Sequence, residues 1–376
     1  MRFRVERDVL AEAVTWTARS LPTRPPVPVL AGVRIEAESS GVVQLSSFDY
    51  EVSARSEIVA DVTEPGTVLV SGRLLADISR SLPAMPVDLV LEGTKVAVTC
   101  GPSRFSLLTM PVDDYPALPA MPDAVGTIAG DQLVEAVGQV TVAASRDDTL
   151  PLLTGVRMEI EGERMTLLAT DRYRLALREL TWNPAQPDIS RVALVRARTL
   201  ADAARSLGGS DEVTLALATG SGVDLIGFEA GGRHTTSLLV DGDYPAVRRL
   251  FPEETSIHAV VGTQALTEAA RRVALVAERN TPVRLAFSEG QVVLDAGQGD
   301  DAQASEALEA ALTGEEITVA FNPQFLLDGL GAFTTNHVRM SFTHPNKPVE
   351  FTGQQTLDGD DDRAYRYLLV PIRFAS

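Results

Sequence analysis

The chain has 376 residues and is 45% hydrophobic, which suits two or three globular domains rather than one core. Its net charge of −18 repels nucleic acid at long range, so charge argues against DNA as a partner unless binding does not depend on overall attraction. A single cysteine excludes a disulfide framework. No apolar run approaches the roughly 18 residues that cross a bilayer, and the first residues alternate between apolar and charged without the apolar core of a signal peptide. We therefore expect a cytoplasmic protein.

The first predicted helix begins near Leu10 and carries a pentad, residues 10–14, that returns at residues 133–137 and 266–270. In each copy apolar residues recur at i, i+3, i+4 and i+7, which predicts an amphipathic helix with one buried stripe. The expected N-caps of the three helices are Asp8, Asp131 and Thr263.

A second helix follows each first helix at a nearly constant distance. Its motif at residues 73–77 recurs at residues 198–202 and 324–328. Because two different motifs recur in the same order, the sequence predicts one domain written three times. We expect the earliest of these second helices to bury Leu74, Ile78 and Leu82.

Between the helices the apolar period changes to two, as in residues 42–45, 96–98 and 213–217, with Gly, Asn and Asp turns between runs. We therefore expect an α+β fold in which each domain has two short helices packed on antiparallel sheets. Proline-rich segments mark the boundaries, which gives domains of residues 1–122, 123–251 and 252–376. A repeat of about 125 residues is long enough to close its own core.

Arginines recur on the polar side of two second helices. Two interpretations stay open: ion pairing at i, i+4 on a solvated surface, or helices of a repeated domain that turn their arginines toward phosphates. The repeated lines consist of Arg73, Asp77 and Arg80, and of Arg198, Asp202 and Arg205.

The sequence gives little support for a catalytic activity. The four histidines show no metal-ligand spacing, and no phosphate-binding loop of the Gly-rich Lys type is present, so we expect no metal and no cofactor. Two aspartate runs, residues 113–114 and 360–362, suit solvated loops better than paired acid–base carboxylates. A hydrolase that uses these runs is the weakest hypothesis.

Three further motifs carry a resemblance. Residues 170–176, 239–245 and 367–373, in this order and on this repeat, resemble the bacterial sliding clamp, the beta subunit of the DNA polymerase III holoenzyme, of the high-GC Gram-positive type. The resemblance implies a head-to-tail homodimer that closes into a ring around duplex DNA. It also implies a processivity role without catalytic activity, loading by a clamp loader, and tethering of the polymerase alpha subunit, other polymerases and repair proteins. A ring held by topology needs only weak attraction to DNA, which reconciles DNA binding with the net charge of −18.

The resemblance also implies a groove that binds a short peptide containing glutamine followed by Leu or Phe. Without the family, core packing is the better interpretation of Leu175 and Pro245. The implied groove residues are Leu153, Thr170, Tyr173, Arg174, Leu175, Pro245, Leu250, Asn322, Phe325, Pro348, Leu368, Val370, Pro371, Ile372 and Arg373.

Two other surfaces follow from the arginine pattern and the resemblance together. An apolar dimer interface is expected at Phe105, Leu107, Leu275 and Val276. The expected DNA-facing residues are Arg24, Arg73, Arg80, Arg146, Arg196, Arg198 and Arg205.

One departure bears on the groove: many relatives have Gly-His where this chain has Arg172-Tyr173, so its peptide preference can differ. Two alternatives to the housekeeping clamp stay open. One is a divergent second clamp copy that gives resistance to a clamp-directed inhibitor. The other is a three-domain adaptor that never binds nucleic acid, which suits the charge of −18.

Overall fold

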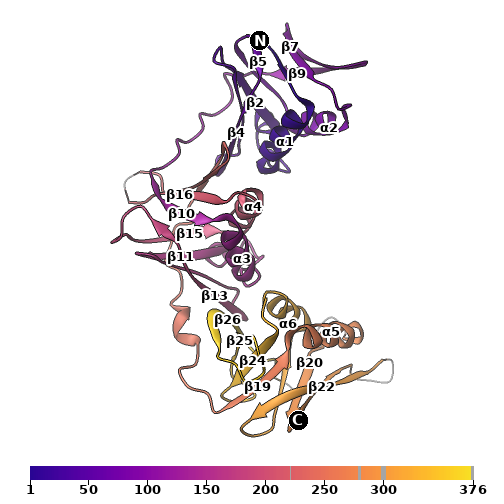
Figure 1. The fold of residues 1–376 in the computed structure, drawn as a ribbon, viewed down its shortest axis with the longest axis vertical. Coiled ribbons are helices and arrows are strands. Elements are labelled where there is room, and N and C mark those ends of the chain that lie inside the picture. Colours follow the sequence, from indigo (N-terminus) through magenta and orange to yellow (C-terminus); the bar gives the residue numbers. More distant parts are fainter. Residues whose placement is uncertain (221, 278–280, 298–301, 374–376) are drawn as a thin grey trace. The chain divides into compact units, whose positions relative to one another are not determined.

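A computed structural model describes residues 1–220, 222–277, 281–297 and 302–373 (Figure 1). Contacts divide the chain into two compact units, and the division runs through the second copy of the repeat. Within the described residues, no helix is both long and apolar enough to span a bilayer. The first unit consists of Met1–Asp131, Asn183–Gln186 and Asp202–Leu239, and the second of Gln132–Trp182, Pro187–Ala201 and Val240–Ser376.

The first copy of the repeat begins with a short strand that leads directly into a helix. Its elements are β1 (Arg2–Val5), α1 (Arg7–Thr17), the 3-10 turns η1 (Ala18–Ser20) and η2 (Pro28–Ala31), β2 (Gly32–Ala37), β3 (Val42–Phe48), β4 (Val52–Val59), β5 (Asp61–Glu64), β6 (Gly66–Ser71), α2 (Gly72–Ser81), β7 (Val87–Glu92), β8 (Lys95–Cys100) and β9 (Ser103–Met110).

The second copy repeats this order. Its elements are β10 (Ala124–Ala129), α3 (Gly130–Thr141), η3 (Pro151–Thr154), β11 (Gly155–Glu161), β12 (Arg164–Thr170), β13 (Arg174–Thr181), β14 (Asn183–Pro184), β15 (Ser190–Arg196), α4 (Ala197–Leu207), β16 (Glu212–Ala218), β17 (Leu225–Ala230), β18 (Arg233–Leu238) and η4 (Val247–Leu250).

The third copy differs in one respect, because a single long strand stands where the earlier copies have two. Its elements are β19 (Ile257–Gly262), α5 (Thr263–Val273), η5 (Ala274–Val276), β20 (Val283–Ser288), β21 (Gln291–Ala296), β22 (Ala304–Thr313), β23 (Ile317–Phe321), α6 (Pro323–Leu330), β24 (His337–Phe342), β25 (Val349–Gln354) and β26 (Asp362–Leu369).

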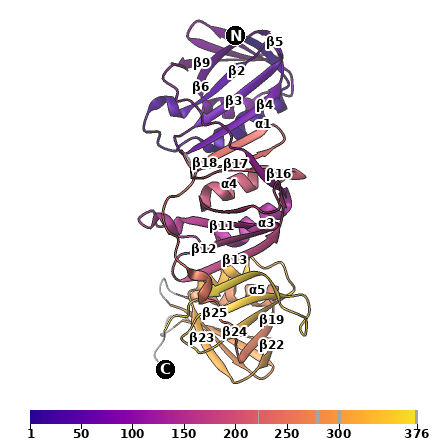
Figure 2. The same ribbon diagram turned by 90° about the vertical axis from the view of Figure 1, so that its left-hand side faces the viewer.

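Strand pairing is the same in all three copies. The strand before the first helix pairs with the strand after the second helix: β1 with β7, β10 with β16, and β19 with β24. The strands after the first helix form antiparallel triplets: β2–β3–β4 and β11–β12–β13, which are labelled in Figure 2, and β20–β21–β22. Equivalent partners in every copy confirm the prediction of an α+β domain written three times.

Neighbouring copies join by strand pairing as well. In the first unit β4 pairs with β18 and so extends one 14-stranded sheet; in the second unit β13 pairs with β26 within a 12-stranded sheet. The strands β4 and β13 are equivalent in the repeat, and so are β18 and β26. Both junctions therefore use the same pair of strands.

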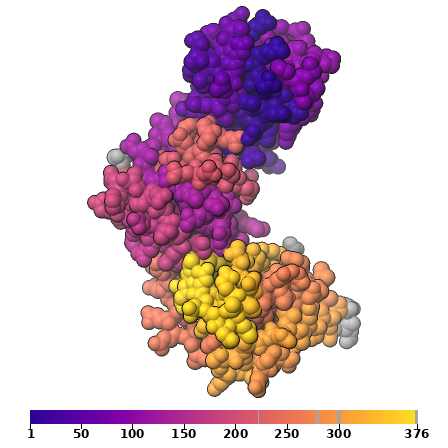
Figure 3. Space-filling view, viewed as in Figure 1, coloured from indigo at the N-terminus to yellow at the C-terminus, as the bar shows by residue number. Residues whose placement is uncertain are grey.

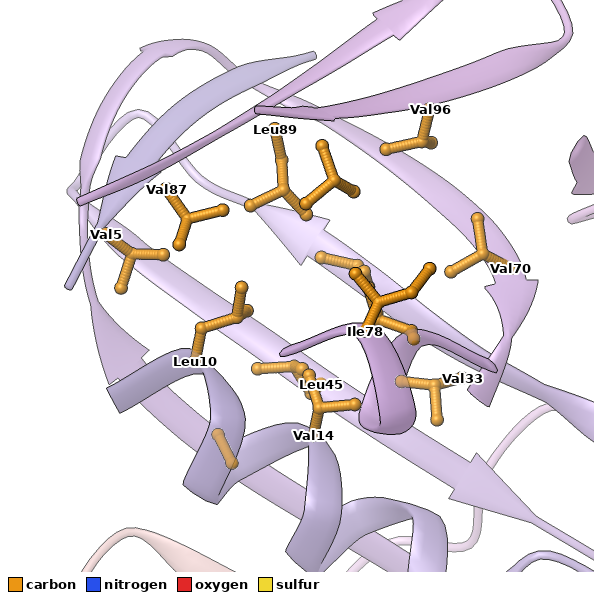
Figure 4. Close-up of a cluster of buried hydrophobic side chains, with 14 of the residues drawn as sticks. Val5, Leu10, Val14, Val33, Leu45, Val70, Ile78, Val87, Leu89 and Val96 are labelled. Carbon is orange, nitrogen blue, oxygen red and sulfur yellow. The ribbon is translucent and has the colours of Figure 1, made fainter. Parts of the chain in front are cut away.

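Each copy buries the stripe that its helices carry. In the first copy α1 lies against α2, and Leu10 and Val14 of α1 face Val33, Leu45 and Val70 of the sheet (Figure 4). Burying one such Leu or Val side chain contributes about 1.5–3 kcal/mol, so these stripes account for the placement of both helices on the sheet.

One predicted core residue is wrong. Leu74 is 50% exposed, whereas Leu75 is fully buried together with Ile78 and Leu82. The stripe of α2 therefore begins one residue later than expected. The i, i+3, i+7 spacing from Leu75 places these three side chains on one face, and Leu74 lies outside that face.

The predicted N-caps are also wrong. Glu6 and Gly262 occupy the cap positions of α1 and α5, and no capping side-chain hydrogen bond is present there. Asp8, Asp131 and Thr263 all lie inside the first turn of their helices. The physical reason is that each helix begins one or two residues earlier than the sequence suggested, so the predicted residues fall inside it, and Gly262 has no side chain that could cap α5.

Candidate partner-binding groove

The fifteen residues assigned to peptide binding, here called the candidate groove, gather around the junction of β13 and β26. Leu175 stands opposite Leu368 in this antiparallel pair. Beyond the end of β26, the backbone N–H of Val370 donates to the carbonyl oxygen of Tyr173 at 2.9 Å. Val370 is thereby held beside Tyr173 of the second copy, and residues toward the C-terminus, yellow in Figure 3, lie on the surface of their unit.

Buried apolar side chains pack against the junction of β13 and β26. Leu175 and Leu368 are each 2% exposed, and Leu153 packs against the same cluster. Core packing, the alternative for Leu175, is thus what this side chain does, whereas Pro245 is exposed. The other buried members of the cluster are Leu168, Leu177, Leu194, Tyr244 and Phe251.

A tight turn between β12 and β13 sets the position of Tyr173. Asp171 Oδ1 accepts hydrogen bonds from the backbone N–H groups of Tyr173 and Arg174, each at 3.0 Å. The turn requires a left-handed residue, and Arg172 takes that conformation with φ of 82°. The position favours glycine, so an arginine here is strained.

The first copy contains the same turn. Asp49 Oδ1 accepts from the backbone N–H groups of Glu51 at 2.9 Å and Val52 at 2.6 Å. Tyr50 there has a φ of 76°, which matches Arg172 at the equivalent place. The repeat therefore extends to backbone conformation, and the turn belongs to the fold of the domain.

Arg174 is the buried anchor of the candidate groove. Its side chain is 4% exposed and donates to Asp171 at 2.9 Å and to Asp328 of α6 at 2.7 Å. Its guanidinium carbon lies 4.3 Å from the centre of the Phe325 ring. Burial lowers the pKa of Arg174, but Tyr367 and the hydrogen bond to Asp328 outweigh that effect and raise the pKa above its usual value.

Sequence reasoning did not assign Asp328 to this site, although a signal existed. Asp328 is the repeat equivalent of Asp77 and Asp202, each of which pairs with an arginine three residues later in its own helix. In the third copy Gly331 occupies that later position. Asp328 instead pairs with Arg174 of the second copy.

Other apolar side chains of the candidate groove are exposed to solvent. Tyr173 is 55% exposed and stacks on Phe325 with ring centres 6.2 Å apart. Leu250 and Val370 are exposed as well. These side chains offer apolar contact area that a single folded chain leaves uncovered.

The remaining groove residues lie within the same unit. Asn322 caps α6, because its Oδ1 accepts from the backbone N–H groups of Gln324 and Phe325. The N–H of Ile372 donates to the carbonyl of Ala320 at 2.8 Å. Thr170 and Pro371 are buried, Pro348 is half-buried and Arg373 is exposed.

The arginines expected to face DNA are mostly exposed. Arg80 pairs with Asp77 at 2.5 Å and Arg205 with Asp202 at 3.0 Å, so the pairs are i, i+3 and not i, i+4. Arg73 instead donates to the backbone carbonyls of Leu21 and Pro22. Arg24, Arg146 and Arg198 are exposed, and Arg196 is half-buried.

The residues expected at the dimer interface differ in exposure. Leu275 is 82% exposed, Phe105 is partly exposed and Val276 is half-buried. Leu107 lies inside the core of the first copy. Its neighbour Leu108, which sequence reasoning did not name, is 68% exposed because successive residues of β9 point to opposite faces.

The aspartate runs do not form a catalytic site. Asp113 and Asp114 are exposed in a loop, and Asp361 pairs with Arg339 at 3.3 Å. In the described ranges, no group of three or more His, Cys, Asp or Glu side chains is arranged to hold a metal ion.

Comparisons with known proteins agree along the whole chain. Three family models match, described as DNA polymerase III beta subunit N-terminal domain over residues 1–119, central domain over residues 127–246, and C-terminal domain over residues 248–372. The beta sliding clamp of Streptomyces coelicolor is 57% identical over 376 residues, which is 100% of both chains. The beta sliding clamp homolog GriR of Streptomyces muensis is 47% identical over 374 residues, again 100% of both.

Solved structures give the same result. A sliding clamp from Pseudomonas aeruginosa, crystallised with griselimycin bound, superposes with a TM-score of 0.91 at 28% identity and covers 100% of both chains. The chain therefore belongs to the bacterial beta sliding clamp family, whose members are DNA sliding clamps and non-catalytic processivity subunits of DNA polymerase III.

Proposed function

We propose that two copies of this chain join head to tail into a closed ring that encircles duplex DNA without reading its sequence. The ring would hold six clamp domains, with boundaries after residues 122 and 251 of each chain. The observation that carries the proposal is that, among the described residues, one edge of β9 over Ser103–Leu108 and one edge of β22 over Ala304–Glu309 have no partner strand.

The repeat indicates which edges should meet. The junction strands β4 and β13 correspond to the first half of β22, and β18 and β26 correspond to β9. Among the described residues, Ala304–Glu309 pair only with β21, and Ser103–Leu108 pair only with β8. The rule that joins the copies within a chain therefore predicts that β22 of one chain pairs with β9 of the next.

Side chains beside these edges support an interface. Phe105 and Leu108 are exposed on β9, and Leu275 is exposed on η5, which follows α5. Unpaired strand edges with exposed apolar neighbours promote association, and a head-to-tail contact that closes leaves no edge open. Aggregation through these edges is thereby avoided.

The candidate groove would tether partners. A short extended peptide with glutamine and a Leu or Phe side chain suits exposed aromatic and aliphatic groups over the buried Arg174 anchor. We expect the polymerase alpha subunit, the clamp loader, and other polymerases and repair proteins to use this site in the cytoplasm. Phe325 and Tyr173 would supply the apolar contacts.

Retention on DNA tests topological binding. The dimer should stay on closed circular duplex after loading and dissociate from the same duplex once it is cut, because only ends release a closed ring. A clamp that leaves circular and linear DNA at equal rates would contradict encirclement. A size measurement that finds only monomers would contradict the dimer.

The higher identity to the S. coelicolor clamp than to the GriR homolog, 57% against 47%, favours the housekeeping clamp over a divergent second copy.

A further inference from the structure

A small cavity lies in the second unit, where the second and third copies join. Its volume is about 70 Å³. The walls come from α3 and β13 of the second copy and from β25, β26 and the segment after α6 of the third copy. A water molecule needs about 10–15 Å³ of such space, so a molecule of several heavy atoms can enter. None of the residues that line the cavity belongs to the candidate groove.

Three polar atoms in the cavity wall have no hydrogen-bond partner among the described residues. They are Oε1 of Gln139, Nε of Arg178 and the hydroxyl oxygen of Tyr365. Gln139 is 4% exposed and Tyr365 is 3% exposed, so bulk solvent does not satisfy these groups. A buried polar group without a partner is costly, and three of them at one cavity point to a bound molecule.

The orientation of the Gln139 amide follows from its other hydrogen bonds. Nε2 donates to Oε1 of Glu135 at 3.3 Å and to the carbonyl oxygen of Ala332 at 3.1 Å. Both amide hydrogens are therefore used, and this network assigns which end of the amide is the oxygen. Oε1 is left as a hydrogen-bond acceptor in the cavity wall.

The other two unpartnered groups are donors. Arg178 of β13 and Tyr365 of β26 stand opposite each other in the strand pair. The end of the Arg178 guanidinium lies 3.7 Å from Glu135, which leaves its Nε–H free to donate. Burial raises the pKa of Tyr365 well above its usual value, so its hydroxyl group keeps its proton. The ring of Phe333, with its centre 4.8 Å away, packs against the Tyr365 ring.

An irregularity in the β25–β26 ladder shapes the same wall. Thr352 stands opposite Arg366, but the next residue, Gly353, stands opposite Asp362. Such a shift re-aims the side chains beside it, and here both Gly353 and Asp362 line the cavity. Asp362 is exposed, so its carboxylate adds a further acceptor on the solvent side.

The equivalent place at the β4–β18 junction is built differently. Trp16 stands there in place of Gln139, and Arg233 in place of Tyr365. Arg233 pairs with Glu12, and its guanidinium carbon lies 5.7 Å from the centre of the Trp16 ring. The three unpartnered groups are therefore a property of the second junction and not of the repeated fold.

We propose that the cavity of the second junction binds a small primary amide. Its NH₂ group would donate to Gln139 Oε1, and its carbonyl oxygen would accept from Arg178 and Tyr365. A carboxylate of the same shape has no N–H to donate and would be repelled by Glu135 and Asp362. An amidinium ion of the same shape has no acceptor, so it would leave both donors unmatched.

Three probes of nearly equal shape test this assignment: acetamide, acetate and acetamidinium, which are neutral, anionic and cationic. Each is titrated at constant ionic strength into the full chain, and its methyl group reports binding in saturation-transfer NMR. The expected result is a saturable signal for acetamide, with affinity at least about tenfold higher than for acetate or acetamidinium.

Two variants each remove one donor. Tyr365→Phe deletes only the hydroxyl group, and Arg178→Lys keeps the positive charge but lacks the Nε–H. Each should weaken acetamide binding about threefold or more. The matched controls are Tyr50→Phe and Arg164→Lys, because both residues are exposed and neither lines the cavity. Circular dichroism checks folding, and if Arg178→Lys does not fold, Tyr365→Phe decides.

The source of the amide is settled by competition. If N-acetylasparagine methylamide displaces acetamide, the cavity accepts a side-chain amide of a partner; if it does not, the ligand is a free small amide. An absent or unsaturable acetamide signal would mean that the cavity holds water only and would overturn the proposal. Equal affinity for the three probes, or unchanged affinity in the folded variants, would overturn it too. The proposal does not rest on DNA binding, so retention on circular DNA would leave the clamp function standing in each case.

Discussion

Replacing Arg174 by glutamine should destabilise the junction of the second and third copies severely. The side chain is buried and carries two short ion pairs, to Asp171 at 2.9 Å and to Asp328 at 2.7 Å. Removing one partner of a buried pair leaves carboxylates uncompensated, and such changes cost about 3–5 kcal/mol. The side chains of Asp171 and Asp328 are only 12% and 18% exposed, so water can replace the lost guanidinium only in part.

Urea unfolding followed by Trp182 fluorescence in a Trp16→Phe background measures this cost within the second unit, which contains both Arg174 and Trp182. The matched control is Arg164→Gln, because Arg164 forms an exposed pair with Glu161 and its loss should change stability little.

A double-mutant cycle separates the pair from its surroundings. Adding Asp328→Asn to Arg174→Gln should recover part of the loss, with a coupling energy of about 1–3 kcal/mol. A loss below about 1 kcal/mol for Arg174→Gln, or no coupling to Asp328, would refute the assignment of Arg174 as the anchor.

Three further changes test separate parts of the account. Arg172→Gly should stabilise the second unit by about 1 kcal/mol in the same urea assay, because glycine adopts the positive φ without strain; a loss of stability would show that the arginine side chain matters more than its backbone. Val370→Asp should abolish binding of a Gln- and Leu-containing peptide, measured by calorimetry, while the dimer mass stays unchanged; unaltered affinity would remove Val370 from the groove. Leu108→Asp should shift sedimentation from dimer to monomer without loss of helical circular dichroism, because it places a charge on the exposed face of the β9 edge; a persistent dimer would count against that edge.

The repeated motifs were sufficient to predict the fold. Pentads and second-helix motifs that recur in order gave three copies with two helices each, and their apolar stripes located the cores. Single-residue details failed where tertiary context decides. Leu74 and Leu75 are both apolar, so the face of α2 depends on how the helix meets the sheet.

The candidate site was predictable only in part. The assignment of residues near Tyr173 and Val370 followed from the family resemblance, whereas the pairing of Arg174 with Asp328 depends on two copies meeting in space. The contact of Arg233 with Trp16 has the same character, because the β4–β18 ladder brings these two residues together. Local patterns do not contain such long-range contacts.

The most direct test of the closed ring is a covalent one. Repeat equivalence places Ser305 of β22 close to Arg104 of β9 in the neighbouring chain, so a Cys100→Ser protein carrying Ser305→Cys and Arg104→Cys should form intermolecular disulfides on oxidation. Loaded on circular duplex and then oxidised, the crosslinked dimer should remain on the DNA through protein denaturation and be released when the DNA is cut. A protein that forms no crosslink, or that denaturant strips from intact circles after crosslinking, would contradict the ring.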